Sequence, residues 1–339
     1  MMKIATPYLL FVGDSPYIKT GLGVRDWRPE LCVGQFRYAS STVSLELPDM
    51  SFAEAVTAGA RTVLLSGAPP GGGLPEHWVD DLCIALESGL DIASGLHDKL
   101  NANPSLKAIA AQHGRKLWDI RTVDRTFSIG QFERRSGKRL LTVGADCVVG
   151  KKYTALALER AFTARGIDAD FRATGQTGIL IAGQGIPIDS VVADFISSAA
   201  VEISPPATPD HWDVIEGQGS LFHPAYAGVT LGLIHGSQPD ALVVCANPAL
   251  SRIAAFELFP QPTLADCVRR YTEAAQLTNP DARVVGISLN TSGYGAAEAE
   301  ALLAQTADEF ALPCVDPIRT GVDAIVDRVL MEEVWPGAT

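Results

Sequence analysis

A glycine-rich turn in the middle of the chain has the residue types that bind phosphate groups. Residues 139–154 read RLLTVGADCVVGKKYT, so an apolar strand ends at Gly144 and a helical pattern follows Gly150 and Lys151. Glycines let the backbone curl with successive N–H groups facing inward, and the positive end of the following helix points at the same place. The turn therefore predicts a cradle for a phosphorylated ligand.

This cradle departs from the usual nucleotide-binding loop in two respects. The usual order is G-x4-G-K-[ST], whereas here five residues separate Gly144 from Gly150, and Lys152 stands where a hydroxyl normally holds magnesium. Thr154 is too far along the helix to replace that hydroxyl. We expect Lys151 to reach phosphate oxygens, while Lys152 is either a second charge at the mouth or a solvated helix residue.

Two other residues of the loop, Asp146 and Cys147, are also expected to contact the phosphorylated ligand. The N–H dipoles around Cys147 are expected to lower the pKa of its thiol, which would suit a nucleophile that accepts an acyl group. The alternative is a small side chain that fits a crowded turn, and we favour it. Asn290 ends a later strand, where its amide would suit the purine edge of ATP or of coenzyme A equally.

One acidic residue and two histidines are candidates for proton transfer. Residues 211–220, HWDVIEGQGS, place Glu216 at the end of an apolar strand, where P-loop folds carry a carboxylate that faces the phosphates and any metal. Glu216 could hold magnesium or act as a base. His223 follows in the next turn and His235 lies further along, and a histidine can move protons near neutral pH. Asp213 is expected to lie inside the sheet edge or to be paired, rather than to be catalytic.

Another polar turn opens at the same expected edge of the sheet. Residues 173–178, ATGQTG, follow a strand, and their threonines and glycines suit hydrogen bonds to an anionic ligand. The expected substrate contacts are Thr174, Gln176 and Thr177, with a plain turn as the alternative for each. No histidine and cysteine cluster has zinc spacing, so no metal site is expected.

The elements that must position these residues alternate between strand and helix. In the first part of the chain, the expected strands span 8–12, 42–47, 62–66, 91–93 and 116–120. The helices between them span 52–58, 75–87 and 104–113. In the second part, the strands span 140–144, 168–173, 212–216, 241–246 and 284–289. The helices there span 151–164, 189–199, 224–233, 263–276 and 295–306. This alternation is typical of parallel sheets covered by helices.

A polar, arginine-rich passage at residues 121–138 interrupts the alternation, and we place the domain boundary there. The expected fold class is α/β, with a Rossmann-like parallel-sheet domain at 1–130 and a P-loop NTPase-like α/β domain at 131–339. A length of 339 residues and a hydrophobic content of 47% suit two cores. The turn at 67–73 follows a strand of the first domain and is a weaker candidate for ligand contact.

Charge and cysteine usage exclude several classes of function. The formal net charge is −12 and no basic run is present, which argues against a nucleic-acid partner. The six cysteines are scattered without a CxxC pair, as in reduced cytoplasmic proteins. No apolar stretch is long enough to span a membrane, and no export signal is present. We expect a cytoplasmic protein with small-molecule substrates, and we also expect a homo-oligomer.

Several blocks of the sequence resemble known families. The glycine-rich loop, the Glu216 turn and the strand end at Asn290 resemble the P-loop fold of the dethiobiotin synthetase type. Four longer blocks resemble more closely the D-glutamate N-acetyltransferase family of the DgcN type, formerly a domain of unknown function. These blocks span 144–152, 173–180, 214–226 and 233–241, and the resemblance extends over nearly all of the chain.

The closer resemblance implies transfer of an acetyl group from acetyl-CoA to the amino group of D-glutamate, in D-amino acid catabolism. A cradle without its magnesium hydroxyl would then bind phosphates of coenzyme A and need not hydrolyse ATP. Amine acetylation requires a base, Glu216 or His223, and donors for the tetrahedral oxyanion, from loop N–H groups or His235. Candidate cations for the dicarboxylate are Arg172, Lys152, Arg134 and Arg135.

Two other functions stay open. An ATP- and magnesium-dependent ligase or kinase of the dethiobiotin synthetase type is supported by the fold and the loop. A nucleotide-sensing or scaffold protein is supported by the poor fit of the loop to a hydrolase. A chelator should abolish the ligase activity but not acetyl transfer, and a sensor would bind ligand without turning over an amine.

Overall fold

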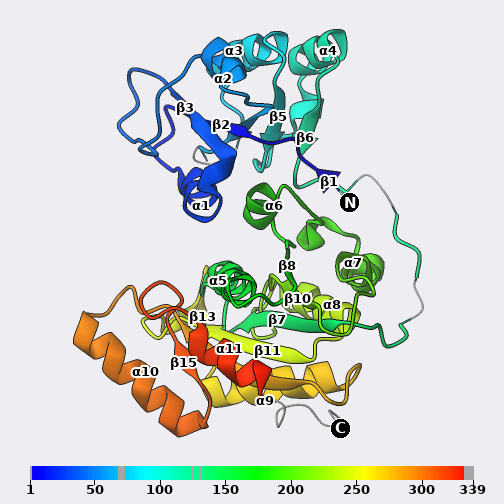
Figure 1. Ribbon diagram of the computed structural model, residues 1–339, viewed down its shortest axis with the longest axis vertical. Helices are drawn as coiled ribbons and strands as arrows, with labels where there is room; N and C mark the ends of the chain where they lie inside the picture. Colours follow the sequence, from blue (N-terminus) through cyan, green and yellow to red (C-terminus); the bar gives the residue numbers. More distant parts are fainter. Residues whose placement is uncertain (1, 68–72, 124–125, 130–131, 332–339) are drawn as a thin grey trace. The chain divides into compact units, whose positions relative to one another are not determined.

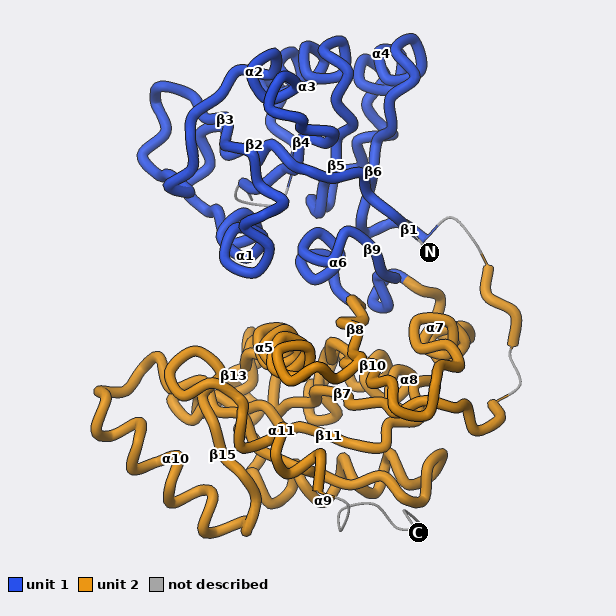
Figure 2. Tube along the Cα trace, in the orientation of Figure 1, with its two compact units in different colours: residues 1–124, 175–190 blue, residues 125–174, 191–339 orange. Residues whose placement is uncertain are grey.

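The computed structural model describes residues 2–67, 73–123, 126–129 and 132–331 (Figure 1). The chain forms two compact units, one of residues 1–124 and 175–190 and the other of residues 125–174 and 191–339 (Figure 2). We call them unit 1 and unit 2. The boundary expected between residues 130 and 131, and most of the turn at 67–73, lie outside the described residues.

Unit 1 contains a parallel five-stranded sheet in the order β3-β2-β4-β5-β6. Its strands are β2 (Tyr8–Gly13), β3 (Cys32–Arg37), β4 (Thr62–Leu65), β5 (Asp91–Ser94) and β6 (Leu117–Asp119). Its helices are α1 (Lys19–Trp27), α2 (Phe52–Thr57), α3 (Glu76–Glu87), α4 (Pro104–His113) and α6 (Gln176–Ala182). A short antiparallel pair joins β1 (Met2–Lys3) to β9 (Gln184–Gly185). The expected α/β fold with a parallel sheet is confirmed for this unit.

The core of unit 1 explains why its strands read as continuous apolar runs. Every residue of β2 and β4 is buried, as expected for a parallel sheet covered on both faces. Phe11 of β2 stacks on Phe36 with 5.2 Å between ring centroids and meets Trp78 of α3 edge to face at 5.0 Å. This sheet therefore packs in a layered α/β core.

Unit 2 contains a parallel six-stranded sheet in the order β15-β14-β11-β7-β10-β8. Its strands are β7 (Lys138–Gly144), β8 (Ala169–Arg172), β10 (Trp212–Ile215), β11 (Ala241–Ala246), β14 (Arg283–Leu289) and β15 (Cys314–Val315). Its helices are α5 (Lys151–Ala164), α7 (Ile196–Ile203), α8 (Ala227–Ser237), α9 (Leu264–Gln276), α10 (Ala296–Phe310) and α11 (Asp323–Leu330). A small hairpin pairs β12 (Arg252–Ile253) with β13 (Phe256–Pro260).

The strand that carries the glycine-rich loop is central in this sheet. β7 lies between β10 and β11, and α5 begins directly after the loop (Figure 1). Since all six strands are parallel, the residues that follow them meet at one edge of the sheet, called here the carboxyl edge. The expected P-loop arrangement of strand, loop and helix is therefore confirmed.

The strand expected at 42–47 is wrong. The side chain of Gln35 on β3 accepts a hydrogen bond from Leu45 N (2.7 Å) and donates to Leu47 O (2.8 Å). Because this side chain binds the backbone of the segment at two points, residues 41–47 form an irregular loop rather than a strand, and Leu45 is its buried residue. The second strand of unit 1 is instead β3, which the sequence did not indicate.

Two helical expectations also need correction. The segment 189–199 forms two short 3-10 turns, Ile188–Ser190 and Ala193–Phe195, before α7 begins at Ile196. The glycine-containing segment expected to be a turn at 173–178 instead enters α6 at Gln176. None of the helices in the described ranges is long and apolar enough to cross a membrane.

Candidate active site

The glycine-rich loop of unit 2 presents unpaired backbone donors. Its entry is fixed by Ala145 N, which donates to Cys245 O at 2.9 Å, and Gly150 takes the left-handed conformation (φ 104°) that turns the chain into α5. Within the described part of the chain, the N–H groups of residues 148–151 have no acceptor. Four donors at a helix N-terminus are the arrangement that binds phosphate or carboxylate oxygens.

Lys151 places a positive charge inside this loop. Its side chain is 4% exposed, and Nζ donates to Asp146 O (2.6 Å) and Cys147 O (3.1 Å). Burial lowers the pKa of the Lys151 ammonium, and nearby Cys245, Cys147, Asp146 and Glu216 offset this only in part. Among the described residues no carboxylate forms an ion pair with Lys151, so an incoming anion would supply the missing counter-charge.

The hydroxyl that usually holds magnesium has no replacement from the helix. Thr154 Oγ1 lies 2.8 Å from Ser288 Oγ and donates to Gly150 O at 3.2 Å, so it is engaged at the contact of α5 with β14. The Lys152 ammonium lies 4.7 Å from the ring centroid of Tyr153. The expectation that Thr154 does not replace the missing hydroxyl is thus consistent with its position.

Glu216 follows β10, the strand next to β7, as the sequence predicted. It is 4% exposed, and its Oε2 accepts a hydrogen bond from Thr174 N at 3.0 Å. Thr174 Oγ1 donates to Glu216 O (2.5 Å) and accepts from Gln218 Nε2 (3.1 Å). The turn after β8 therefore fixes one oxygen of this buried carboxylate.

The glycine after Glu216 is required by the closeness of two strands. A Cβ at Gly217 would lie 1.7 Å from Thr142 O, and Gly217 N donates to Thr142 Oγ1 at 3.0 Å. No side chain fits between these backbones. Gly217 therefore holds the turn after Glu216 against β7.

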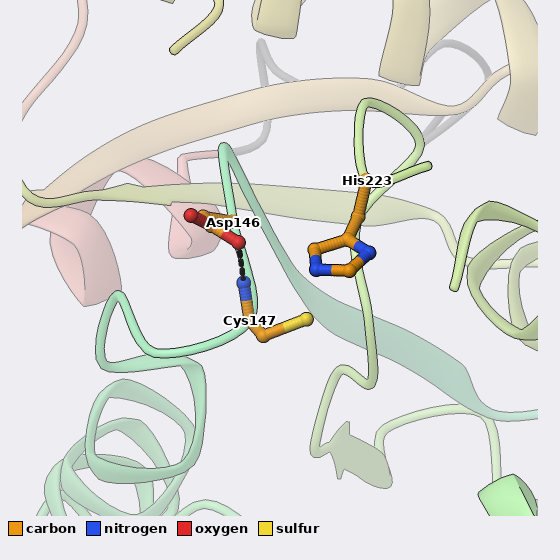
Figure 3. Close-up of side chains that lie close together, drawn as sticks. All are labelled: Asp146, Cys147 and His223. Carbon is orange, nitrogen blue, oxygen red and sulfur yellow. Dashed lines mark hydrogen bonds between the residues drawn. The ribbon is translucent and has the colours of Figure 1, made fainter. Parts of the chain in front are cut away.

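His223 lies beside the loop together with Asp146 and Cys147 (Figure 3). One potential ligand atom of each of the three lies within 4.8 Å of the others. His223 is 2% exposed, and its ring stacks on Tyr226 with 4.5 Å between centroids. Phe256 of the β12–β13 hairpin meets the same ring edge to face at 5.0 Å, so the imidazole is held on two sides.

The expected lowering of the Cys147 pKa is wrong. Burial raises the pKa of this thiol, and the charge of Lys151 counteracts burial only in part. The thiol is half-buried in the loop rather than open to water. This environment favours the alternative, in which Cys147 is a small residue that fits the turn.

Asp146 connects the loop to the β12–β13 hairpin. One carboxylate oxygen accepts from Cys147 N (2.6 Å), and the other accepts from Ala254 N (2.6 Å) and Gln261 Nε2 (2.7 Å). The side chain is completely buried. Asp146 thus has a structural role in shaping the cradle, and no sequence pattern indicated the hairpin that it anchors.

Two other residues lie near the carboxyl edge: Tyr271 supports the loop, and Asn290 follows a strand. Tyr271 of α9, which sequence reasoning missed, donates to Gly144 O (2.7 Å) and accepts from Leu221 N (3.0 Å). A single buried tyrosine in a strongly amphipathic helix was the available signal. Asn290 follows β14, as predicted, and its Oδ1 accepts from Ser292 N at 3.1 Å.

The candidate substrate residues are divided between the two units. Thr174 lies in unit 2 beside Glu216, whereas Gln176 and Thr177 begin α6 of unit 1. Arg172 donates to Asp213 Oδ1 at 2.5 Å and pairs with Asp170 at 2.9 Å. The expected pairing of Asp213 is confirmed, and the Arg172 guanidinium is already neutralised.

Three other candidates lie at the amino edge of the unit 2 sheet, opposite the loop. His235 is in the last turn of α8, which runs from the end of β10 to the start of β11. Arg135 precedes β7 and caps α7 and α8 by donating to Ser204 O (3.0 Å) and Gly236 O (2.9 Å). Arg134 pairs with Asp281 at 3.1 Å. These positions separate them from the cradle.

A second cluster of aspartates and a histidine is neutralised by an arginine side chain. Asp170, His211 and Asp213 lie close enough to hold a metal ion. Arg172 forms ion pairs with both of these aspartates, and His211 bonds to Asp213 at 3.2 Å. This cluster is therefore satisfied as an ionic network of β8 and β10.

Comparisons with known proteins agree with the two-unit architecture. A Rossmann-like domain of unknown function, DUF1611_N, matches residues 35–123, and the P-loop domain of unknown function DUF1611_C matches residues 126–326. Two proteins named D-glutamate N-acetyltransferase are similar over 96% of this chain and 99% of their own length. One, from Pseudoalteromonas sp, is 49% identical, and the other, from Tritonibacter scottomollicae, is 46% identical.

A solved structure is similar over the same extent. The crystal structure of a DUF1611 family protein from Anabaena variabilis has a TM-score of 0.83 and 30% sequence identity. The match covers 96% of this chain and 99% of that chain.

Proposed function

The chain belongs to the DUF1611 family, and on that premise we propose that it is a D-glutamate N-acetyltransferase that uses acetyl-CoA. The observation that carries the proposal is the end-to-end similarity to two curated D-glutamate N-acetyltransferases, at 49% and 46% identity. The match leaves only a few residues of either relative uncovered. The activity named for those relatives thus extends to both units of this chain.

The cradle suits a phosphate group of the acetyl donor. The free N–H groups of residues 148–151 and the buried ammonium of Lys151 would bind it, with Lys152 at the mouth of the loop. Asn290 is the proposed contact for the purine edge. When bound, acetyl-CoA supplies a thioester carbonyl that an amine can attack. Because Lys152 replaces the magnesium-binding hydroxyl, the loop supports binding without phosphate cleavage.

We propose Glu216 as the group that accepts the substrate proton. The ammonium of an amino acid must lose a proton before its nitrogen can form the new C–N bond. Glu216 is a buried carboxylate at the carboxyl edge, and Thr174 N orients one of its oxygens. The nitrogen, which now carries two hydrogens, attacks the thioester carbonyl and the C–S bond breaks. The departing thiolate takes up one of the two protons, and the other stays on the amide nitrogen of the product.

The test is release of free thiol from acetyl-CoA with a panel of D- and L-amino acids. We expect thiol release with D-glutamate, insensitive to EDTA, and much less with L-glutamate or D-aspartate. Glu216→Gln should lower kcat on the order of 100-fold or more while coenzyme A still binds. No thiol release with D-glutamate, together with EDTA-sensitive ATP consumption with another acid, would support the ligase alternative instead.

We also propose a homo-oligomer in the cytoplasm, as the sequence suggested. All six cysteines are free thiols, which is consistent with a reducing compartment. Light scattering of the purified protein would establish the oligomeric state.

A further inference from the structure

The two ring nitrogens of His223 have different environments. Nδ1 lies 3.2 Å from Ala225 N, and because a backbone N–H only donates, Nδ1 must accept this hydrogen bond. The neutral ring therefore carries its proton on Nε2. Figure 3 shows one ring nitrogen turned toward Asp146 and Cys147 and the other turned away from them. Since Nδ1 is bound to Ala225, the nitrogen that faces the loop is Nε2.

The imidazole is buried as a whole, and its Nε2–H has no acceptor within the described part of the protein. Tyr226 and Phe256 pack on the ring and prevent it from turning elsewhere. A ligand oxygen placed beside the loop would therefore supply the acceptor that this ring lacks.

The same proton position argues against two other roles. A general base at this place would need a bare Nε2 and a proton on Nδ1, directed at the Ala225 N–H. A metal ion bound by Asp146, Cys147 and His223 would impose the same tautomer, because a ligating histidine donates from its other nitrogen. The Asp146 carboxylate is moreover occupied by three protein donors.

We propose that His223 is a fixed, neutral hydrogen-bond donor of the anion cradle. Its Nε2–H faces Cys147, a loop residue whose carbonyl also accepts a hydrogen bond from the Lys151 ammonium, so the imidazole and the lysine adjoin the same loop residue. In ordinary P-loops a magnesium ion helps to bind the phosphate. Here His223 would help to bind the anion without a metal ion. The proposal rests on the proposed function in that the anion is a phosphate group of acetyl-CoA.

Calorimetric titration of the full chain with coenzyme A tests the proposal, with inorganic pyrophosphate as a second probe. A lost hydrogen bond to a charged group predicts that His223→Ala weakens binding of both probes by about 10- to 100-fold. His223→Gln, whose amide can donate from a similar place, should bind within about threefold of the wild type. The matched control is His235→Gln, which should bind both probes normally because His235 lies at the opposite edge of the sheet. The Nε2 of His235 is buried and has no partner among the described residues.

Nitrogen NMR of the His223 ring distinguishes ligand binding from a purely structural role, because a purely structural histidine would keep the same ring chemical shifts when coenzyme A binds. We expect the Nε2–H tautomer in the free protein and a shift of the Nε2 proton on coenzyme A binding. The Nδ1–H tautomer would overturn the proposal. So would one equivalent of zinc in the purified wild type that His223→Gln removes, or a large kcat loss in His223→Gln with unchanged coenzyme A affinity.

The proposal and the proposed function fail in different ways. If binding of either probe depends on His223 but D-glutamate is not acetylated, the donor role stands and the proposed acetyltransferase activity fails. Active enzyme whose His223→Ala variant binds both probes normally would overturn the donor role alone. A folded wild type that binds neither probe would also overturn it. Thermal unfolding of each variant identifies any that fails to fold.

Discussion

Two adjacent lysines of the loop have the same chemistry but different surroundings. Lys151 is buried and bonded to the carbonyls of Asp146 and Cys147, whereas Lys152 is half-buried over the ring of Tyr153. A buried ammonium without an ion pair interacts strongly with an incoming anion, since little water screens its charge. Lys152 is more exposed than Lys151, so solvent screens its charge more strongly. The two residues should therefore differ in their effect on ligand binding.

We predict that Lys151→Met weakens coenzyme A binding by about 10- to 100-fold, the effect of losing a charge-assisted hydrogen bond. Methionine keeps most of the buried stem and so limits loss of packing. Lys152→Met is the matched control and should change the affinity less than threefold. Calorimetric titration measures both. Equal effects of the two substitutions would show that burial of Lys151 does not matter for binding.

The sequence could predict positions that depend on one local pattern. The places of Lys151, Glu216 and Asn290 follow from a motif and from strand ends that share one edge. It could not predict the raised pKa of Cys147 or the pairing of Arg172, because both depend on side chains contributed by other segments. The tautomer of His223 likewise depends on the backbone of the turn that follows it.

At the scale of elements, the loop and the β12–β13 hairpin are joined by one carboxylate. Asp146 accepts from Ala254 N and Gln261 Nε2 on either side of the hairpin. Ile253 is also buried and Phe256 packs on His223, whereas Leu258 at the far part of the hairpin is 92% exposed. Asp146 therefore limits how often the hairpin opens.

We predict that Asp146→Asn makes the hairpin at least several-fold more sensitive to chymotrypsin at Leu258 and Phe259. The NH2 group of asparagine would face an N–H donor that now binds a carboxylate oxygen. That donor would lose its acceptor, so the hairpin would open more often. Asp210→Asn, an exposed position of the same unit, is the control. Limited proteolysis with mass spectrometry locates the cuts, and equal rates in all three proteins would contradict the anchoring role of Asp146.

The ionic cluster on β8 and β10 should make stability depend on pH. Burial lowers the pKa of His211, but its hydrogen bonds to Asp168 and Asp213 and their charges outweigh burial, so the pKa is raised. A raised pKa in the folded state stabilises the protein below the ordinary value of about 6.5, and this contribution disappears as pH rises through the folded value.

We predict that the urea midpoint of the wild type is higher than that of His211→Gln. This difference should be largest at pH 6 and should shrink toward pH 9. His113→Gln, an exposed residue at the end of α4, should show no such trend. Urea unfolding followed by circular dichroism at several pH values measures the difference. A gap that widens with pH would mean that the native cluster prefers the neutral ring.

At the scale of the whole chain, alternation of strands and helices predicted two parallel sheets, but not that unit 1 is discontinuous. Residues 175–190 return from unit 2 to form α6 and β9 of unit 1. α6 packs on α1, and β9 pairs with β1. The alternating pattern continues across this segment, so nothing local in the sequence distinguishes it from the second sheet. Only its apolar partners, far away in the chain, assign it to unit 1.

This topology predicts that residues 1–124 do not form a complete folding unit. Ile179, Leu180 and Ile181 of α6 are buried, and burial of three such side chains contributes on the order of 5 kcal/mol. We expect a fragment of residues 1–124 to unfold at lower temperature than the same fragment joined to residues 175–190 by a flexible linker. A linked fragment with Leu180→Asp should lose that gain, because a carboxylate cannot be buried there without a partner. Circular dichroism melting compares the three, and equal melting of all three would mean that α6 adds nothing to the stability of unit 1.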